Sequence, residues 1–346
     1  MMSGARADET LMFREAQESA EVVERQRRRN AVAVARLGGR LRRHPPRAVV
    51  TLARGSSDHA ATFARYLIER RARVLTSSLS PSIASIYSAT PALNGTLALA
   101  ISQSGRSPDL LMAAEQARDR GAFLVALVND EDSPLAALAD VTLPLAAGRE
   151  QSVAASKSFI ASLAAILDLL ASWTEDAALD AALSTLPKRL ERAWIADWSP
   201  AVEALEQAEN AFVVARGHGL GVAQEAALKL KETCALHAEA FSGAELRHGP
   251  MALLRPGFPV LVFAQSDETL TSMSELAAAA AERGASVISS GIAGAPGVAL
   301  PTATAGPLIA PVLQVASFYR MANALAVARG LDPDRPPHLS KITETR

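Results

Sequence analysis

The chain has 346 residues, a formal net charge of −1 and a single cysteine. This length suffices for two domains of ordinary size, each with its own core, and a lone cysteine excludes an internal disulfide framework. The near-neutral charge excludes a global field that would attract nucleic acid or an anionic membrane. We find no secretory signal at the N-terminus and no apolar run that approaches a membrane span, so we expect a soluble, cytoplasmic protein.

The chain begins with an uninterrupted helical pattern from Thr10 to Arg43, which we assign to an N-terminal helix over residues 10–44. The pattern contains the basic run Glu24-Arg25-Gln26-Arg27-Arg28-Arg29. Such a run can bind nucleic acid, but acidic residues upstream favour a solvated helix face. We therefore expect no nucleic acid and no membrane among the partners.

Residues 45–180 alternate strand-like and helix-like segments. The apolar runs AVVTLA, ARVLTSS, TLALAI, AFLVALV and VTLPLA are separated by helical patterns, and a helix over 156–174 closes the unit. This alternation predicts a parallel sheet covered on both faces. The polar stretch 175–200 then predicts a helical linker.

Residues 200–330 repeat this order with AFVVA, a long Ala-rich helix, PVLVFA, ASVISS, VALP and a helix over 308–329. The tail, 331–346, is rich in proline and can be neither helix nor central strand through 333–337.

The two units are variations of each other at an offset of 162 residues. The offset maps Ala53-Arg54-Gly55 onto Ala215-Arg216-Gly217 and Gln103-Ser104 onto Gln265-Ser266. Each identity closes a strand-like run, so the chain reads as a duplicated α/β unit.

Two turns of the first copy suit a phosphate. Gly55-Ser56-Ser57 and the run 102–107, SQSGRS, each follow a strand and open a helix. Free N–H groups and the dipole at a helix N-terminus favour an anion, and the carboxyl ends of parallel strands bring such loops together. The alternative is that these serines are only helix N-caps. Neither turn is a P-loop, and the glycines of 217–221 lack the spacing of a dinucleotide fingerprint.

The second copy carries candidate acid–base groups. Glu225, Lys229 and Glu232 share one helix face, and His248 follows in a loop with small residues. One interpretation is a solvated Glu–Lys pair, which contributes only ~0.2–0.5 kcal/mol. The other is an acid–base set, in which a carboxylate moves a proton between adjacent sugar carbons and a histidine assists ring opening.

These residues resemble a known family. The segment EAALKLKETCALHAEAFSGAELRHGPMAL (225–253), the loop SQSGRS, the segment EQSVAASK (150–157) and the tail Leu-Ser-Lys (339–341) are similar to the sugar-isomerase (SIS) domains of glucosamine-6-phosphate synthase and its relatives. The resemblance implies an α/β fold with two tandem SIS domains, each a doubly wound parallel sheet in flavodoxin-like order, with an N-terminal helix and an extended C-terminal tail.

The resemblance also implies roles for individual residues. Glu232 matches the base that moves a proton between carbon-1 and carbon-2, His248 the ring-opening histidine and Lys341 the lysine that engages the open-chain carbonyl. The family's substrate- and phosphate-binding positions match Ser56, Ser57, Ser102, Gln103, Ser104, Ser107, Ala155 and Ser340. Val153 matches a backbone contact to the sugar. Glu225 and Lys229 match residues that support the site. No metal or organic cofactor is implied. Ala155 stands where the synthase has a serine.

The synthase begins with a glutaminase domain bearing a catalytic N-terminal cysteine, which this sequence does not contain. A stand-alone pair of SIS domains resembles the deaminating branch, which converts glucosamine 6-phosphate to fructose 6-phosphate and ammonia. We therefore expect a sugar phosphate as the small-molecule partner and a homodimer with shared active sites, since the family donates the histidine to the neighbouring subunit. Alternatives are another phosphosugar isomerase, a fructosamine-phosphate deglycase, ammonia-dependent synthesis, or a binding regulator without turnover.

Overall fold

A computed structural model of the protein describes residues 6–339 and Lys341. Ser340, an expected sugar ligand, lies outside the described residues. Packing divides the chain into two units. The N-terminal unit comprises Glu21–Glu150, Lys157–Ser184 and Lys341, and the C-terminal unit comprises residues 6–20, Gln151–Ser156 and Thr185–Leu339.

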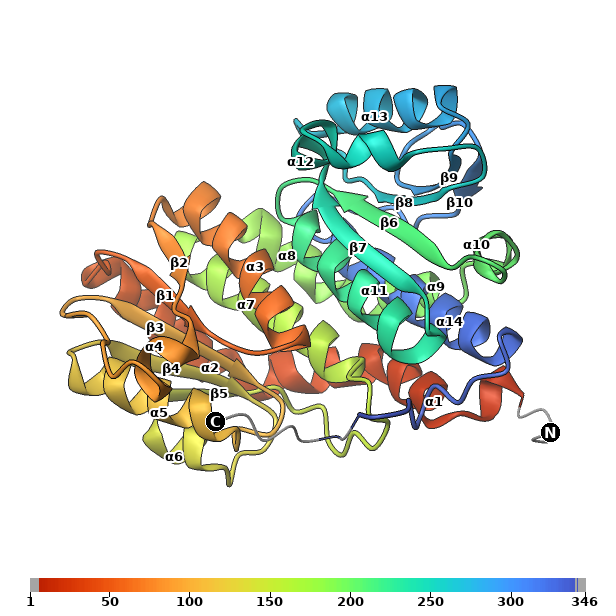
Figure 1. Ribbon diagram of the computed structural model, residues 1–346. Helices are drawn as coiled ribbons and strands as arrows, with labels where there is room; N and C mark the ends of the chain where they lie inside the picture. The colour runs from red at the N-terminus through yellow and green to blue at the C-terminus, as the bar shows by residue number, and fades with distance from the viewer. Residues whose placement is uncertain (1–5, 340, 342–346) are drawn as a thin grey trace. The chain divides into compact units, whose positions relative to one another are not determined.

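The N-terminal unit is built on a five-stranded parallel sheet in the order β2-β1-β3-β4-β5 (Figure 1). The strands are β1 (Val49–Leu52), β2 (Thr76–Ser78), β3 (Leu97–Ser102), β4 (Phe123–Val128) and β5 (Val141–Pro144). Every residue of β1 and β3 is buried, as expected for strands covered on both faces. The order is that of a flavodoxin-like sheet, which confirms the predicted fold class.

Helices cover both faces of this sheet. One face packs its Val, Leu and Ala side chains against α4 (Pro81–Ser85), α5 (Pro108–Asp119) and α6 (Pro134–Leu138). The other helices of the unit are α2 (Ser19–Arg43), α3 (Ser56–Leu67), α7 (Lys157–Thr174) and α8 (Ala177–Ser184), with a π-helical turn at Ile68–Ala72. Helix α7 is long and apolar enough to cross a membrane by length and composition, which corrects the expectation that every apolar run is too short. Because 83% of it is buried inside the protein, it has the character of a core helix.

The C-terminal unit repeats the same sheet, in the order β10-β9-β8-β6-β7. The strands are β6 (Asn210–Ala215), β7 (His237–Ser242), β8 (Pro259–Phe263), β9 (Ser286–Ser290) and β10 (Val298–Leu300). One face packs against α12 (Gly243–Arg247) and α13 (Leu270–Glu282). The remaining helices are α1 (Leu11–Gln17), α9 (Leu186–Trp194), α10 (Ser199–Leu205), α11 (Gly219–Cys234) and α14 (Ala310–Ala328), with 3-10 turns at Ala7–Glu9 and Pro250–Leu253.

Two elements differ from the sequence-based expectation. The single N-terminal helix is interrupted at Glu18, where α1 ends before α2 begins at Ser19. Strand β7 was not predicted, because only one of its six residues is buried and its sequence, HAEAFS, lacks an apolar run. The stretch 175–200 is helical as predicted, since it holds α8, α9 and the start of α10.

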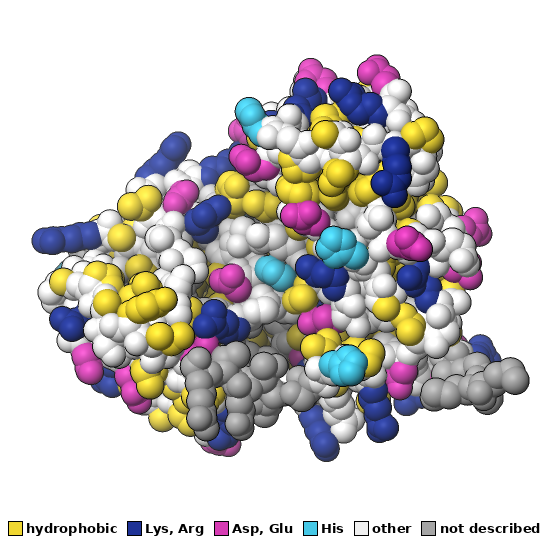
Figure 2. All heavy atoms as spheres, in the orientation of Figure 1, with side chains coloured by type: hydrophobic (Ala, Val, Ile, Leu, Met, Phe, Trp, Pro, Cys, Tyr) yellow, Lys and Arg dark blue, Asp and Glu magenta, His cyan; other side chains and the backbone are white. Residues whose placement is uncertain are grey.

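Basic and acidic side chains are interspersed on the face shown in Figure 2. Three arginines of the basic run have partners in the N-terminal unit. Arg25 donates to the Ala146 carbonyl at 2.7 Å, Arg27 pairs with Asp168 and Asp180, and Arg29 pairs with Glu131.

Candidate active site

The predicted phosphate loops lie side by side in the N-terminal unit. They follow β1 and β3, which are paired neighbours in the sheet, so both loops emerge at its carboxyl edge. Ser56 and Ser57 are the first residues of α3, and Ser107 directly precedes α5. In the described part of the chain, the hydroxyls of Ser57 and Ser107 make no hydrogen bond. They are therefore available to an incoming anion at two helix N-termini.

The SQSGRS loop is held in a tight turn by its own hydroxyls. The Gly105 amide donates to Ser102 Oγ at 2.9 Å, and the Arg106 amide donates to Ser104 Oγ at 3.3 Å. Gly105 has φ +62°, and an added Cβ would lie 2.3 Å from Ser133 Oγ, so a side chain is excluded there. Gln103 is half-buried in the same loop.

An ion pair ties the two loops together. Arg54, which lies two residues after the end of β1, donates to Asp109 Oδ2 at 2.9 and 2.6 Å. The Asp109 side chain is only 1% exposed and lies in the first turn of α5. This pair links the two loops without using the Ser57 or Ser107 hydroxyl.

The corresponding turn of the C-terminal unit is already occupied by its own carboxylate. The 162-residue offset places Asp267 where the first copy has Gly105. Asp267 Oδ1 accepts from the Thr269 amide at 2.9 Å and the Thr269 hydroxyl at 2.6 Å. Burial raises the pKa of Asp267, but these hydrogen bonds and the nearby His218 outweigh burial and hold the pKa below its usual value. A phosphate is therefore disfavoured in this copy, by both charge and geometry.

The acid–base set lies on α11 of the C-terminal unit. Lys229 Nζ contacts Glu225 Oε1 at 3.4 Å and Glu232 Oε2 at 2.6 Å. Lys229 and Glu225 are 1% and 0% exposed, so the interpretation as a solvated helix pair is wrong. The Tyr319 hydroxyl donates to Glu225 Oε1 at 2.9 Å. Burial lowers the pKa of Lys229, but attraction by Glu225 and Glu232 outweighs burial and raises it above its ordinary value.

Glu232 is the member of this set that reaches a surface. Its side chain is 22% exposed, and it lines a pocket of about 290 Å³. The other walls come from the end of α11 and from the tail, including Asp332, Pro337 and Leu339. A carboxylate fixed by a buried lysine and open to a pocket can act as a general base.

His248, the predicted ring-opening residue, lies on a different element from the α11 set. It follows α12, and it is exposed. Among the described residues, its ring makes no hydrogen bond or ion pair. The next residue, Gly249, has φ +152°, and nothing lies within 4 Å of an added Cβ. The loop therefore presents a histidine whose ring is available to a partner.

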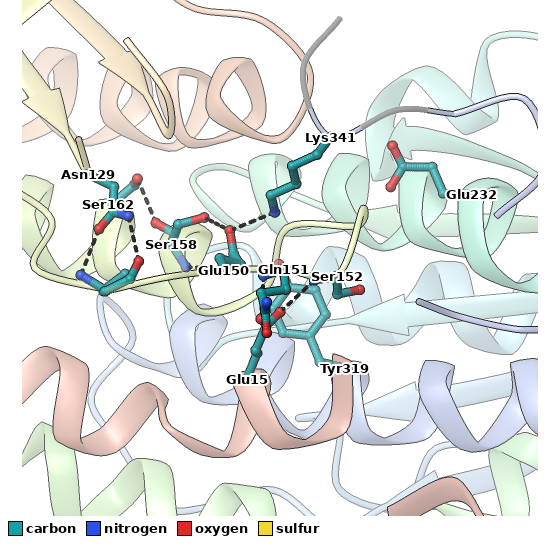
Figure 3. Close-up of polar contacts among 12 residues, drawn as sticks. Glu15, Asn129, Glu150, Gln151, Ser152, Ser158, Ser162, Glu232, Tyr319 and Lys341 are labelled. Carbon is teal, nitrogen blue, oxygen red and sulfur yellow. Dashed lines mark hydrogen bonds and ion pairs between the residues drawn. The ribbon is translucent and has the colours of Figure 1, made fainter. Parts of the chain in front are cut away.

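The segment that carries Val153 and Ala155 is held by a residue that the sequence reasoning missed. Glu15 on α1 is buried, and its carboxylate accepts the backbone amides of Gln151 and Ser152 (Figure 3). The Val153 amide donates to the Asp334 carbonyl at 3.2 Å. The Asp334 carboxylate in turn caps α1, because it accepts the Leu11 and Met12 amides, both at 2.7 Å. The Glu15 carboxylate and the Asp334 backbone carbonyl thus hold this segment.

Lys341 is anchored in the N-terminal unit. Its Nζ lies 3.3 Å from Glu150 Oε2, and the same oxygen accepts the Ser158 hydroxyl at 2.7 Å (Figure 3). The sequence motif contained Glu150, but spacing alone gave it no role. Its partner Lys341 is 191 residues away, a separation that no local pattern can indicate.

The single cysteine, Cys234, is buried, and burial raises the pKa of its thiol to about 11. Among the described residues, no group of three or more His, Cys, Asp or Glu side chains is arranged to hold a metal ion.

The doubled sheet, the hydroxyl-rich turns in one copy and the carboxylate set in the other are the arrangement that the resemblance to tandem SIS domains predicts. Comparison with known proteins agrees. The SIS domain model matches residues 44–172 and again 204–326. The chain belongs to the SIS domain family.

The chain is similar to curated aminotransferases. The chain is 36% identical over 310 residues to the glutamine–fructose-6-phosphate aminotransferase (isomerizing) of Aeropyrum pernix, covering 83% of this chain and 49% of that protein. It is 34% identical over 328 residues to the Leifsonia xyli enzyme of the same name, covering 85% and 51%. The chain spans about half the length of the curated relatives it matches.

Solved structures share the fold. A candidate phosphosugar isomerase from Silicibacter pomeroyi is 43% identical, with a TM-score of 0.90 over 94% of this chain and 100% of that one. Glucosamine-6-phosphate deaminase from Thermotoga maritima has a TM-score of 0.78 at 21% identity, covering 97% of this chain and 100% of that one. The second likeness shows the fold alone.

Proposed function

We propose that the protein is a deaminating aldose–ketose isomerase that converts glucosamine 6-phosphate and water to fructose 6-phosphate and ammonia. The observation that carries the proposal is Glu232, a half-buried carboxylate fixed at 2.6 Å by the buried Lys229 and lining a pocket. A pure sugar-phosphate sensor needs the serine loops but has no use for a positioned base. The family membership and the tail lysine add support.

The proposed reaction starts with ring opening, assisted by His248. The serine loops bind the phosphate, and Lys341 engages the open-chain carbonyl. Glu232 takes the proton from carbon-2, which the adjacent aldehyde acidifies, and the electron pair forms a carbon-1–carbon-2 double bond. The carbonyl oxygen takes up a proton from solvent, which gives an enaminol. Glu232 then returns the proton to carbon-1, which leaves an imine at carbon-2. Water hydrolyses the imine, releasing ammonia and fructose 6-phosphate.

The test is to incubate the protein with glucosamine 6-phosphate alone and to measure ammonia and fructose 6-phosphate in equal amounts. Wild-type protein should form both, and Glu232→Gln should form neither at a comparable rate. The matched control is Glu239→Gln, since Glu239 is exposed on β7 of the same unit. Wild-type protein that binds the substrate but forms no product would refute the deaminase proposal.

The second candidate is the reverse direction, synthesis of glucosamine 6-phosphate from fructose 6-phosphate. The observation that favours it is the similarity to aminotransferases at 36% identity. Parallel incubations of fructose 6-phosphate with ammonium and with glutamine distinguish the candidates. Formation of glucosamine 6-phosphate in either mixture, without deamination under the first conditions, would replace the first proposal by this one.

We further propose a homodimer in which His248 is donated to the neighbouring subunit's site. The histidine ring is exposed, lies on a loop with small residues and has no hydrogen-bond partner among the described residues, which supports this exchange. Two copies related by a two-fold axis would exchange the histidine reciprocally. Mixing Glu232→Gln chains with His248→Ala chains should then restore activity, because each mixed dimer has one site without a defect. Mixed chains that exchange subunits and stay inactive would place both residues in one chain's site.

A further inference from the structure

We propose that Glu150 is a positioning residue that anchors the tail lysine, Lys341, for its contact with the open-chain carbonyl. The inference rests on the proposed function for the role of Lys341, and on contacts within the N-terminal unit for the anchor. Glu150 Oε2 lies 3.3 Å from Lys341 Nζ. Figure 3 shows the lysine side chain pointing toward this carboxylate.

The Glu150 carboxylate is held by contacts that do not involve the lysine. Its side chain is fully buried, and it accepts the Ser158 amide at 3.2 Å and the Ser158 hydroxyl at 2.7 Å. Ser158 lies in the first turn of α7, where backbone amides lack partners within the helix. Glu150 therefore serves as a cap for this helix, and its geometry is set by the helix rather than by the tail.

The lysine is held but remains reachable. Its side chain is 25% exposed, whereas Lys157 and Lys229 are 2% and 1% exposed. A primary amine that must contact a substrate carbonyl has to lie at a solvent-reachable position and in one place. Removing a long side chain's freedom before the reaction lowers the barrier by pre-organisation. A buried, pre-oriented carboxylate supplies that restraint to a chain end.

The test uses the full chain, its Glu150→Gln variant and the matched control Glu131→Gln, in which the changed residue is an exposed glutamate of the same unit. The chain has five lysines, of which Lys188 and Lys231 are exposed internal references. Two probes are read by mass spectrometry of peptides. One is formaldehyde with cyanoborohydride, a small reagent that methylates reachable amines. The other is fructose 6-phosphate with cyanoborohydride, which traps an imine formed with bound sugar.

Glu150→Gln should change the two probes in opposite directions at Lys341. Methylation should become about threefold faster or more, the scale expected when a partly exposed ion pair is lost. Trapping of fructose 6-phosphate should fall, and kcat should fall while KM stays near the parent value, since the serine loops are unchanged. Lys188 and Lys231 should react as in the parent. General damage to the fold would instead change the references and KM together.

A folded Glu150→Gln protein whose Lys341 methylates at the parent rate would overturn the proposal. If this variant does not fold, Glu150→Asp keeps the charge but withdraws it by one methylene, and the same rates at Lys341 decide. Failure of the proposed function is distinguishable. In that case, the parent neither deaminates glucosamine 6-phosphate nor traps the sugar, while the methylation probe still reports on the anchor.

Discussion

The buried lysine of α11 gives the most direct test of how the acid–base set is held. Lys229 is 1% exposed and contacts two carboxylates, one of which, Glu225, is 0% exposed. Replacing Lys229 by Met preserves much of the volume but removes the cation that lies 3.4 Å from the buried Glu225 carboxylate. Breaking a buried pair from one side costs ~3–5 kcal/mol.

The assay is urea-induced unfolding monitored by circular dichroism, and the measured quantity is the midpoint of the transition in which the C-terminal unit unfolds. With a denaturant slope of about 2 kcal/mol per M, a loss of ~3–5 kcal/mol lowers the midpoint by about 1.5–2.5 M. The matched control is Lys231→Met, two residues along the same helix but exposed, which should leave the midpoint within about 0.3 M, as for a neutral surface change. The double variant Glu225→Gln/Lys229→Met should recover most of the loss, because it removes the buried charge while the amide oxygen can still accept the Tyr319 hydroxyl.

The pH dependence has a definite sign. The pKa of Lys229 is raised in the folded protein above its ordinary value of 10.5. The contribution of its ion pairs to stability is therefore fully present below pH 10.5 and is lost as the pH rises further.

A Lys229→Met midpoint equal to that of the parent at neutral pH would refute this account, since it would mean that Glu225 is not a buried charge held by the lysine.

Three further outcomes are expected. Glu232→Gln should lower turnover by ~10²–10⁴-fold with little change in KM, and parent-like turnover would remove Glu232 as the base. Replacing Ser102 and Ser104 by Ala should weaken binding of 6-phosphorylated sugars, whereas unphosphorylated glucosamine should bind very poorly to the parent; equal affinities of the parent for the two sugars would exclude the serine loops as the phosphate site. Cys234 should resist a thiol reagent at pH 8 and react in urea, because burial raises its pKa to about 11; rapid reaction in the folded protein would contradict its burial.

The repeat made the sheets predictable. Apolar runs predicted nine of the strands, and their alternation with helices predicted parallel sheets covered on both faces. The strand order was implied by the resemblance to SIS domains. Strand β7 was not predicted, because five of its six residues are partly or fully exposed. The 162-residue offset would have located it, since the offset carries β2, residues 76–78, onto 238–240, inside β7. Internal alignment of a duplicated chain can thus find strands that lack hydrophobic patterning.

The candidate site was predictable where its chemistry is local. Helical spacing placed Glu225, Lys229 and Glu232 on one face, and turn chemistry indicated the serine loops. The contacts of Glu15 with Gln151 and Glu150 with Lys341 span 136 and 191 residues, and no periodicity relates their partners. The burial of Glu225 and Lys229 could not be predicted from the sequence either, because the i, i+4 spacing of Glu and Lys is the same on a solvated helix face and in a core.

Duplication explains why the two copies can do different chemistry with the same turn. A parallel sheet opens its carboxyl edge to a ligand in each copy, and the first copy leaves that edge to hydroxyls and a glycine at residue 105. The second copy places the Asp267 carboxylate in the matching turn, where it accepts the Thr269 amide and hydroxyl itself. The Asp267 carboxylate therefore makes this turn a poor site for a second anion. Under the proposed function, the first copy alone orients the substrate through its phosphate, and the helix that follows β6 in the other copy carries Glu232 and its buried lysine.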